Sequence, residues 1–271
     1  MTTRDTEGLS LTFGNDEAVL QIIPMIAEKK SVLGKLLALG VQKASRKIGK
    51  NSHKWALCNS KGLEQSRVET RVVKSYALAF AVNPRGPDHL HTECIAAGGA
   101  TGEMRDLLER ITGKTWPESA TCYPEIVKWH EDIYAAAETL GFCAFTCTSA
   151  MAILEDEMVE ILKLATGRQL SVTDLMQIGE RIVTLEKCYN AREGADRALD
   201  DLPWRIMNEP LPSGMVTSKQ WLNEMLDQYY ALHGWNPDTS WPTPATLKNL
   251  NLTECIPSVR SNHQRALNVR E

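Results

Sequence analysis

The sequence predicts a mainly α-helical protein. Apolar residues recur at spacings of three and four in several segments, the pattern of helices that bury one face. Several of these segments begin after a serine or an asparagine and end before a glycine, residue types that favour the two ends of a helix. We therefore expect helices throughout the chain, with at most a few short strands.

The amino-terminal third is predicted to form short helices. Asn15 is the expected N-cap of a helix that extends to Glu28, and Pro24 is expected to kink or split that helix. Two further helical segments follow, the first of them capped by Ser31. The apolar segment 71–81 comes after an irregular polar stretch, and its pattern suits either a strand or a helix.

A loop at 83–93 concentrates ionisable groups between apolar flanks. It reads N-P-R-G-P-D-H-L-H-T-E, and its two prolines and one glycine exclude regular structure. Its ionisable residues are Arg85, Asp88, His89, His91 and Glu93. Such a loop is a candidate functional site. The alternative is a solvated turn without a function.

The strongest helical pattern covers Pro124 to Phe145. One apolar stripe along this helix comprises Ile126, Trp129, Ile133, Ala137 and Leu140. Gly141 follows the last apolar turn, where a residue that tolerates positive φ closes a helix. Cys143 comes two residues later, where a thiol can be presented at a fixed angle to a metal or cofactor. The alternative is that Cys143 is a small buried core residue.

Three more helices are expected in the carboxy-terminal half. Ser149 is predicted to begin the first, and Ser171 with Asp174 forms a capping box for the longest, which ends before Gly194. The buried stripe of that longest helix is predicted to comprise Leu175, Ile178, Ile182, Leu185 and Tyr189. The charged loop after Gly194 is expected to pair its Arg and Asp residues internally, and a last amphipathic helix is expected at 218–232.

Composition and charge exclude several classes of function. The 271 residues are 43% hydrophobic and 24% charged, which fits one large or two modest globular domains. A net charge of −4 gives no reason to expect nucleic acid as a partner. No apolar run approaches the roughly 20 residues that a membrane span needs, and the first residues lack the plan of a secretory signal. We therefore expect a cytoplasmic protein that binds neither nucleic acid nor membrane.

Neither the cysteine spacing nor any short sequence motif indicates a metal, nucleotide or hydrolase site by itself. The seven cysteines are scattered and include no C-x-x-C pair, which argues against a disulfide framework and leaves a metal site unsupported. The glycine-rich nucleotide loops, G-x-S-x-G and H-E-x-x-H are also absent. Nothing in these patterns supports nucleotide binding, serine hydrolysis or zinc-protease chemistry.

Five segments, in order, resemble the carboxy-terminal two domains of the tungsten-dependent aldehyde:ferredoxin oxidoreductases. They are G-L-S-L-T-F-G-N-D-E-A from Gly8, N-P-R-G-P-D-H-L from Asn83, E-T-L-G-F-C-A-F from Glu138, the stretch from Glu180 to Gly194 with the following D-D-L-P-W-R, and Y-Y-A-L-H-G-W-N from Tyr229. The resemblance spans roughly 7–252. It implies two packed helical lobes, 1–95 as part of family domain 2 and 96–271 as family domain 3.

The resemblance also implies cofactors and site residues. A tungsten (or molybdenum) bis-pterin with a [4Fe–4S] cluster would oxidise an aldehyde to a carboxylic acid and pass the electrons to ferredoxin. Cys143 corresponds to the last cluster cysteine, and His89 to a histidine of the substrate cavity, with His91 as the alternative. The turn that contacts one pterin corresponds to Glu138, Leu140, Gly141 and Phe142. A thiolate suits iron, and an imidazole exchanges protons near neutral pH. We also expect the loop at His89 to face the turn at Cys143, because both segments lack regular structure but lie between strongly apolar elements.

Two departures from the family limit what the chain is expected to do alone. Glu138 stands where the family has Asp, and the family's amino-terminal β-rich domain with its three clustered cysteines is absent. Cys143 would supply only one of four cluster ligands, so we expect an amino-terminal partner domain or subunit and little iron in the isolated chain. A homo-oligomer is compatible with this interpretation. The alternatives are a related aromatic acyl-CoA reductase subunit and a cofactor-free helical remnant that acts as a binding or scaffold protein.

Overall fold

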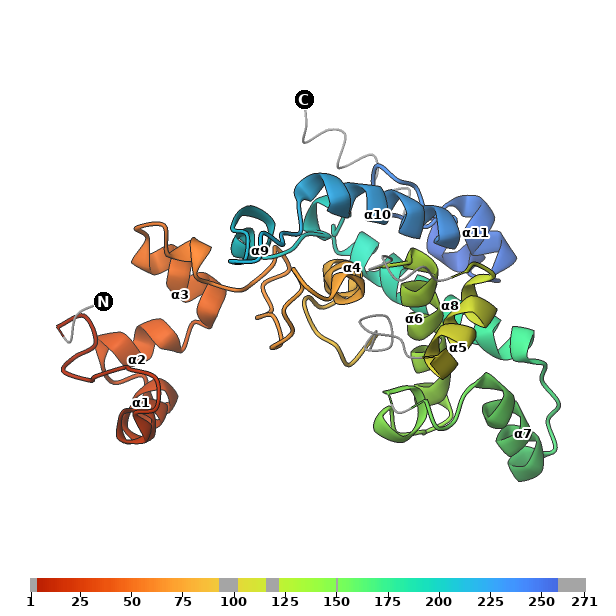
Figure 1. Cartoon of the computed structure of the whole chain (residues 1–271), viewed down its shortest axis with the longest axis horizontal. Helices are drawn as coiled ribbons and strands as arrows, with labels where there is room; N and C mark the ends of the chain where they lie inside the picture. Colours follow the sequence, from red (N-terminus) through yellow and green to blue (C-terminus); the bar gives the residue numbers. More distant parts are fainter. Residues whose placement is uncertain (1–3, 93–101, 116–121, 150, 258–271) are drawn as a thin grey trace.

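The computed structural model describes residues 4–92, 102–115, 122–149 and 151–257, and its helices form an extended arrangement (Figure 1). The predicted mainly α fold is confirmed. Within these described ranges, extended segments pair only at two isolated bridges, Cys58 with Glu64 and Trp235 with Pro242.

Three short helices form an amino-terminal arm, which lies at one end of the molecule in Figure 1. The arm comprises α1 (Asp16–Glu28), α2 (Val32–Leu37) and α3 (Val41–Ile48). The predicted caps are confirmed, because the side chain of Asn15 accepts from the Ala18 amide and that of Ser31 from the Gly34 amide. Pro24 does not split α1. Proline has no amide hydrogen, so the Leu20 carbonyl lacks its usual donor within the helix. Leu20 is exposed, and water can supply that hydrogen bond instead.

Four longer or more deeply buried helices form what we call the body. They are α4 (Lys74–Val82), α6 (Pro124–Thr139), α8 (Val172–Arg192) and α10 (Lys219–His233). The apolar segment 71–81, which suited either a strand or a helix, is therefore helical from Lys74 onwards, and every residue of α4 from Ser75 to Val82 is buried. Side chains of all four helices share one hydrophobic core. The capping box at Ser171 and Asp174 is confirmed.

Shorter elements surround the body. They are the 3₁₀ turn η1 (Ser52–Lys54), α5 (Gly102–Thr112), the π-helical turn η3 (Phe145–Ser149), α7 (Glu155–Thr166), η4 (Arg197–Leu199), α9 (Trp204–Asn208), α11 (Pro244–Asn249) and η5 (Thr253–Cys255). The prediction that Ser149 begins a helix is wrong. Its hydroxyl hydrogen-bonds with the Tyr134 hydroxyl at 2.8 Å instead of capping, and α7 begins at Glu155.

The central helix α6 is buried on more than the one predicted stripe. Every residue from Ile126 to Ala137 except Lys128 is buried, including the ionisable His130, Glu131 and Asp132. This happens because α4, α8 and α10 all pack against α6. The contact with α8 is especially close, since a Cβ added at Gly179 would lie 1.9 Å from the Asp132 carbonyl oxygen.

The predicted buried stripe of α8 is largely wrong. Leu185 and Tyr189 are 47% and 58% exposed, and Ile178 is also exposed. The residues that α8 buries are Leu175, Gly179, Val183, Thr184, Cys188 and Ala191. The close approach to α6 selects small side chains, whereas a search for apolar periodicity selects large ones.

The predicted ion pairing within the charged loop after Gly194 also needs correction. Asp200 pairs with Lys61 and Lys187, and Arg197 pairs with Asp227, so the partners come from other parts of the chain. The division into lobes 1–95 and 96–271 stays a prediction, because its boundary lies outside the described residues. No helix among the described residues has both the length and the apolar character that crossing a membrane requires.

Candidate functional site

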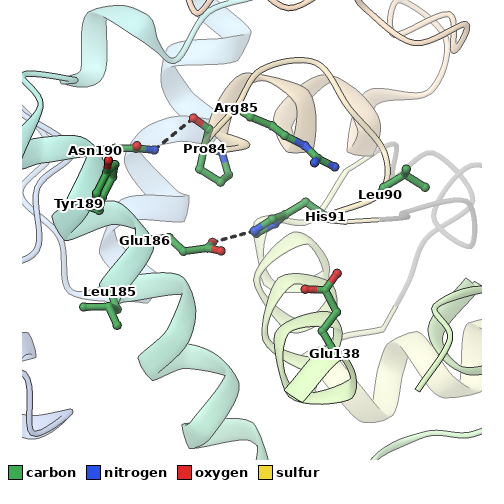
Figure 2. A pocket seen from close by; sticks show the side chains of 9 residues that line it. All are labelled: Pro84, Arg85, Leu90, His91, Glu138, Leu185, Glu186, Tyr189 and Asn190. Carbon is green, nitrogen blue, oxygen red and sulfur yellow. Dashed lines mark hydrogen bonds and ion pairs between the residues drawn. The ribbon is translucent and has the colours of Figure 1, made fainter. Parts of the chain in front are cut away.

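A pocket of about 520 Å³ opens where the 83–92 loop, the end of α6 and the carboxyl-terminal third of α8 meet (Figure 2). Its lining residues are Pro84, Arg85, Leu90, His91, Glu138, Leu185, Glu186, Tyr189 and Asn190. It therefore combines apolar surface with two acidic and two basic side chains. The loop that was predicted from its ionisable residues supplies one wall, and Glu138, predicted at the end of the central helix, lies on another.

The wall formed by the loop is held by hydrogen bonds to buried groups. The fully buried Asn83 donates from Nδ2 to the Asp88 carbonyl at 3.0 Å, and its Oδ1 accepts from the Arg85 amide at 3.0 Å. Asn190 of α8 donates from Nδ2 to the Pro84 carbonyl at 3.1 Å. Arg85 also forms an ion pair with Asp88. These contacts make the loop an ordered part of the molecule rather than a solvated turn.

Glycine is required at the apex of this loop. Gly86 has a φ of +123°, which L side chains rarely adopt, and it lies against the segment that contains Leu63. A Cβ at this position would approach the Leu63 Cβ to 2.7 Å. The glycine therefore permits the backbone conformation and the close packing at once.

His91 is the histidine that lines the pocket, where its Nε2 lies 2.8 Å from Oε2 of Glu186. Burial disfavours the imidazolium, but the hydrogen bond to Glu186 and the negative charges of Glu131, Glu186 and Glu138 outweigh it, so the pKa of His91 is raised. Its Nδ1 is buried and has no hydrogen-bond partner within the described part of the chain. His91 therefore binds a proton more tightly than a free imidazole does.

His89 lies outside this set of lining residues. Its Nδ1 is 3.2 Å from the Ser66 hydroxyl oxygen, and the side chain is half-buried. The structure thus brings Arg85 and His91 of the loop together with Glu138, but it does not bring His89 into the pocket. The catalytic role of His89 stays a prediction.

The turn after α6 presents a thiol to solvent. Leu140 caps the helix, and Gly141 follows with a φ of +78° and open space where a Cβ would be. The Phe142 amide donates to the Ala137 carbonyl at 3.0 Å, which folds the turn back on the helix. Cys143 is exposed and free, so the alternative of a buried core residue is excluded. The contacts of Glu138, Leu140, Gly141 and Phe142 with a pterin stay predictions.

The described residues fit one ligand of an iron–sulfur cluster rather than a complete set. A [4Fe–4S] cluster is normally held by four thiolates. Cys147 is one helical turn beyond Cys143, but it is buried in a cluster that includes Met158. No group of three or more His, Cys, Asp or Glu side chains suited to a metal ion occurs in the described ranges. The exposed thiol of Cys143 is accessible enough to serve as one such ligand.

Sequence reasoning did not single out the α8 side of the pocket. Glu186 and Asn190 are four residues apart and so share one face of the helix, which Leu185 and Tyr189 border in Figure 2. The sequence shows that this face carries both polar and apolar side chains. It does not show that the face lines a pocket, because the opposite wall is a loop some hundred residues earlier in the chain.

The sequence matches known proteins along most of its length. Residues 1–252 match the family model described as "Aldehyde ferredoxin oxidoreductase, domains 2 & 3". The chain is 28% identical over 244 residues to the tungsten-containing aldehyde ferredoxin oxidoreductase of Pyrococcus furiosus and 30% identical over 236 residues to that of Thermococcus kodakarensis. These alignments cover 89% and 85% of this chain, but 38% and 36% of the relatives.

Two further likenesses are more distant. The aliphatic sulfonate oxidoreductase, WOR-like subunit, of Pyrococcus furiosus is 25% identical over 279 residues, which cover 97% of this chain and 39% of that protein. The active site complex BamBC of benzoyl coenzyme A reductase with 1,5 dienoyl-CoA has a similar fold, with a TM-score of 0.70 at 21% identity over 98% of this chain and 43% of that chain. The chain therefore spans about two fifths of the length of the relatives that it matches.

Proposed function

This chain belongs to the aldehyde ferredoxin oxidoreductase family, and we propose that it supplies the helical domains 2 and 3 of a tungsten- or molybdenum-pterin, iron–sulfur oxidoreductase. The proposed reaction converts an aldehyde and water to a carboxylic acid, two electrons and two protons, and the electrons pass to ferredoxin. The metal–pterin group, when bound, supplies a two-electron acceptor. The observation that carries the proposal is the pocket in which His91 and Glu186 face the end of the helix that leads to Cys143.

The pocket's own residues suit the proton transfers of this reaction. As an imidazolium, His91 can donate to the carbonyl oxygen of an aldehyde, and as a neutral ring it can accept a proton. Glu186 holds the ring by its Nε2 and favours the charged form. General acid–base catalysis of this kind contributes about 10²–10⁴-fold to a rate. His89, at the position of the family's cavity histidine, is the second candidate for the same role.

The cofactors are proposed to be held jointly with another part of the protein. Cys143 would supply one thiolate to the [4Fe–4S] cluster, and Glu138, Leu140, Gly141 and Phe142 would contact one pterin. The remaining ligands would come from an amino-terminal domain or subunit. We further propose that the assembly works in the cytoplasm, with ferredoxin or another iron–sulfur protein as electron acceptor.

The test is anaerobic purification of the complete assembly from cells supplied with tungstate or molybdate. We expect both metal and iron to be bound, and an aldehyde to reduce a viologen dye in an enzyme-dependent manner. Activity with an aromatic acyl-CoA thioester and none with aldehydes would replace the proposed reaction by that of an acyl-CoA reductase. An assembly that contains neither metal nor iron would favour the scaffold alternative.

Two matched variants identify the histidine that transfers protons. His91→Asn is expected to lower kcat by about 10²–10⁴-fold with the metal retained, whereas His89→Asn should have a much smaller effect. The opposite result would assign the role to His89. Full rates across pH 6–9 in both variants would exclude a proton-transfer role for either ring.

A further inference from the structure

The buried ammonium group of Lys61 lies at the carboxyl end of α4, immediately before the pocket loop. Its Nζ donates to the carbonyl oxygens of Ala81 at 2.6 Å and Asn83 at 2.7 Å, and lies 2.8 Å from Oδ1 of Asp200. An ammonium group has three N–H donors, so these three acceptors satisfy it completely. A cation here also faces the negative end of the α4 dipole.

Asp200 connects this lysine to two other helices of the body. Its side chain is 2% exposed, and its Oδ2 lies 3.0 Å from Nζ of Lys187 on α8 and accepts from the Tyr230 hydroxyl of α10 at 2.7 Å. Burial raises the pKa of this carboxyl, but Lys187 and Lys61 outweigh burial and the pKa is lowered overall. The charged carboxylate therefore ties the end of α4 to α8 and α10.

The segment around Lys61 also packs directly on the loop. Ser60 donates from its amide and its hydroxyl to the two carboxylate oxygens of Asp201, at 2.8 and 2.6 Å. Leu63 lies against Gly86 at the loop apex. The short segment 60–63 is thus fixed to the chain at 200–201 on one side and supports the loop on the other.

We infer that Lys61, held by Asp200, is a positioning residue for the pocket: it fixes the start of the 83–92 loop relative to α8, so that His91 meets Glu186. Lys61 is not among the residues that line the pocket, so it acts through the backbone of Ala81 and Asn83. The inference rests on the proposed function in taking this pocket as the site.

The direct readout is the titration of His91 in the 271-residue chain, followed by NMR and assigned with His91→Gln. The charged groups that face this imidazole are Glu186 on α8, Glu131 and Glu138 on α6, and Arg85 on the loop. Lys61→Met is expected to lower the His91 midpoint by about one pH unit or more, because the loop no longer holds the ring against Glu186. A folded Lys61→Met chain with the wild-type midpoint would overturn the inference.

Two variants separate positioning from a general loss of stability. Arg71→Met is the control, because it also removes a buried cation. Arg71 pairs with Glu69 and donates to the Glu209 carbonyl at 2.8 Å, and neither of these partners belongs to the loop. It should leave the His91 midpoint unchanged. Lys61→Arg keeps a cation beside Asp200 and should retain a midpoint closer to that of the wild type than Lys61→Met does. Equal midpoint changes in Arg71→Met and Lys61→Met would contradict a specific role.

A double variant keeps the test decisive if Lys61→Met does not fold. Lys61→Met combined with Asp200→Asn removes both charges of the Lys61–Asp200 pair, which is better tolerated than leaving one of them buried alone, and the amide oxygen of the new asparagine can still accept from Lys187. The end of α4 still lacks its cation, so we expect the lowered His91 midpoint. A wild-type midpoint in this double variant would overturn the inference.

Failure of the inference and failure of the proposed function are distinguishable. In the complete assembly, Lys61→Met should lower kcat for the aldehyde, and the decrease should be larger for a larger change in the His91 titration midpoint. A lowered midpoint in a chain whose wild-type assembly does not oxidise aldehydes would retain the positioning role and reject the proposed reaction. An unchanged His91 midpoint in Lys61→Met, together with a wild-type assembly that oxidises aldehydes, would retain the proposed reaction and reject the positioning role.

Discussion

The amino-terminal arm and the body consist of similar helices, but they bury very different fractions of their side chains. In α4 of the body, every residue from Ser75 to Val82 is buried. In α1 of the arm, Ala18 alone is buried, and Leu20 is 70% exposed. Caps define the ends of helices in both regions, whereas tertiary contacts support the helices of the body. The pocket lies where those contacts are dense.

The ion pairs of the two regions differ in exposure in the same way. The Lys61–Asp200 pair, which contacts the body helices, has side chains that are 10% and 2% exposed, whereas Lys30 and Glu28 in the arm are 79% and 52% exposed. Water and salt screen the second pair but not the first. The comparison indicates that stability, pH dependence and site geometry all reside in the body, and each of the following changes tests it.

Asp200→Ala should have the largest effect. It leaves Lys61 and Lys187 without their carboxylate, and breaking a buried pair in this way costs about 3–5 kcal/mol of unfolding free energy. Urea unfolding followed by circular dichroism measures the loss. Glu28→Ala in the arm is the control, with an expected change below about 0.5 kcal/mol. Similar values for the two variants would remove the distinction between the regions.

One substitution at two glycines compares the regions directly. A Cβ at Gly179 would lie 1.9 Å from the Asp132 carbonyl oxygen, and one at Gly34 would lie 2.0 Å from the Met25 carbonyl oxygen. Gly179→Ala must separate α6 from α8, at a cost of about 3 kcal/mol in the main unfolding transition. Gly34→Ala separates only α1 from α2, so the main transition should stay within about 0.5 kcal/mol of the wild type. A large shift of that transition in Gly34→Ala would show that the arm unfolds together with the body.

A fall in pH should lower the unfolding free energy of the body through His130. The arm lacks such a group, because α1 to α3 contain no histidine. Burial lowers the pKa of His130 to about 3, and neither ring nitrogen has a hydrogen-bond partner within the described residues. The unfolded chain binds a proton below about pH 6.5 while the folded chain does not, so stability falls as the pH falls from about 6.5 towards 3. At pH 5 this linkage costs about 2 kcal/mol.

His130→Phe should remove that cost, which urea unfolding of both proteins at pH 7 and pH 5 measures. His91 acts in the opposite direction, because a raised pKa contributes stability below the unfolded value that is lost as the pH rises through the folded value. An unchanged pH dependence in His130→Phe would contradict the burial of a neutral ring at this position.

Leu20→Ser should have the smallest effect. The side chain is mostly exposed on α1, so its replacement is expected to change the unfolding free energy by less than about 0.5 kcal/mol. Helical content by circular dichroism is the control for local unfolding of α1. A loss above about 1 kcal/mol would mean that α1 makes contacts in solution that are absent from this structure, and the comparison between arm and body would fail.

The sequence by itself determined where many helices begin and end. Asn15, Ser31, and Ser171 with Asp174 cap helices as their residue types predict. Gly141 follows α6 with the positive φ that was expected of it. These features depend on backbone groups within four residues, so local chemistry is sufficient to predict them. The loop dense in ionisable groups was likewise recognisable as a candidate site, and the structure places part of it along the pocket.

Only the tertiary structure decided which side chains meet. It selected helix for the ambiguous segment of α4, buried His130 and Glu131 on a helix whose pattern showed one stripe, and turned Leu185 and Tyr189 of α8 towards the pocket. It also placed His91, rather than His89, against Glu186. Each of these outcomes depends on a neighbour far along the chain, and on close helix contacts that small residues such as Gly179 permit. Periodicity reports that a face is apolar, but the packing partner determines which face is buried.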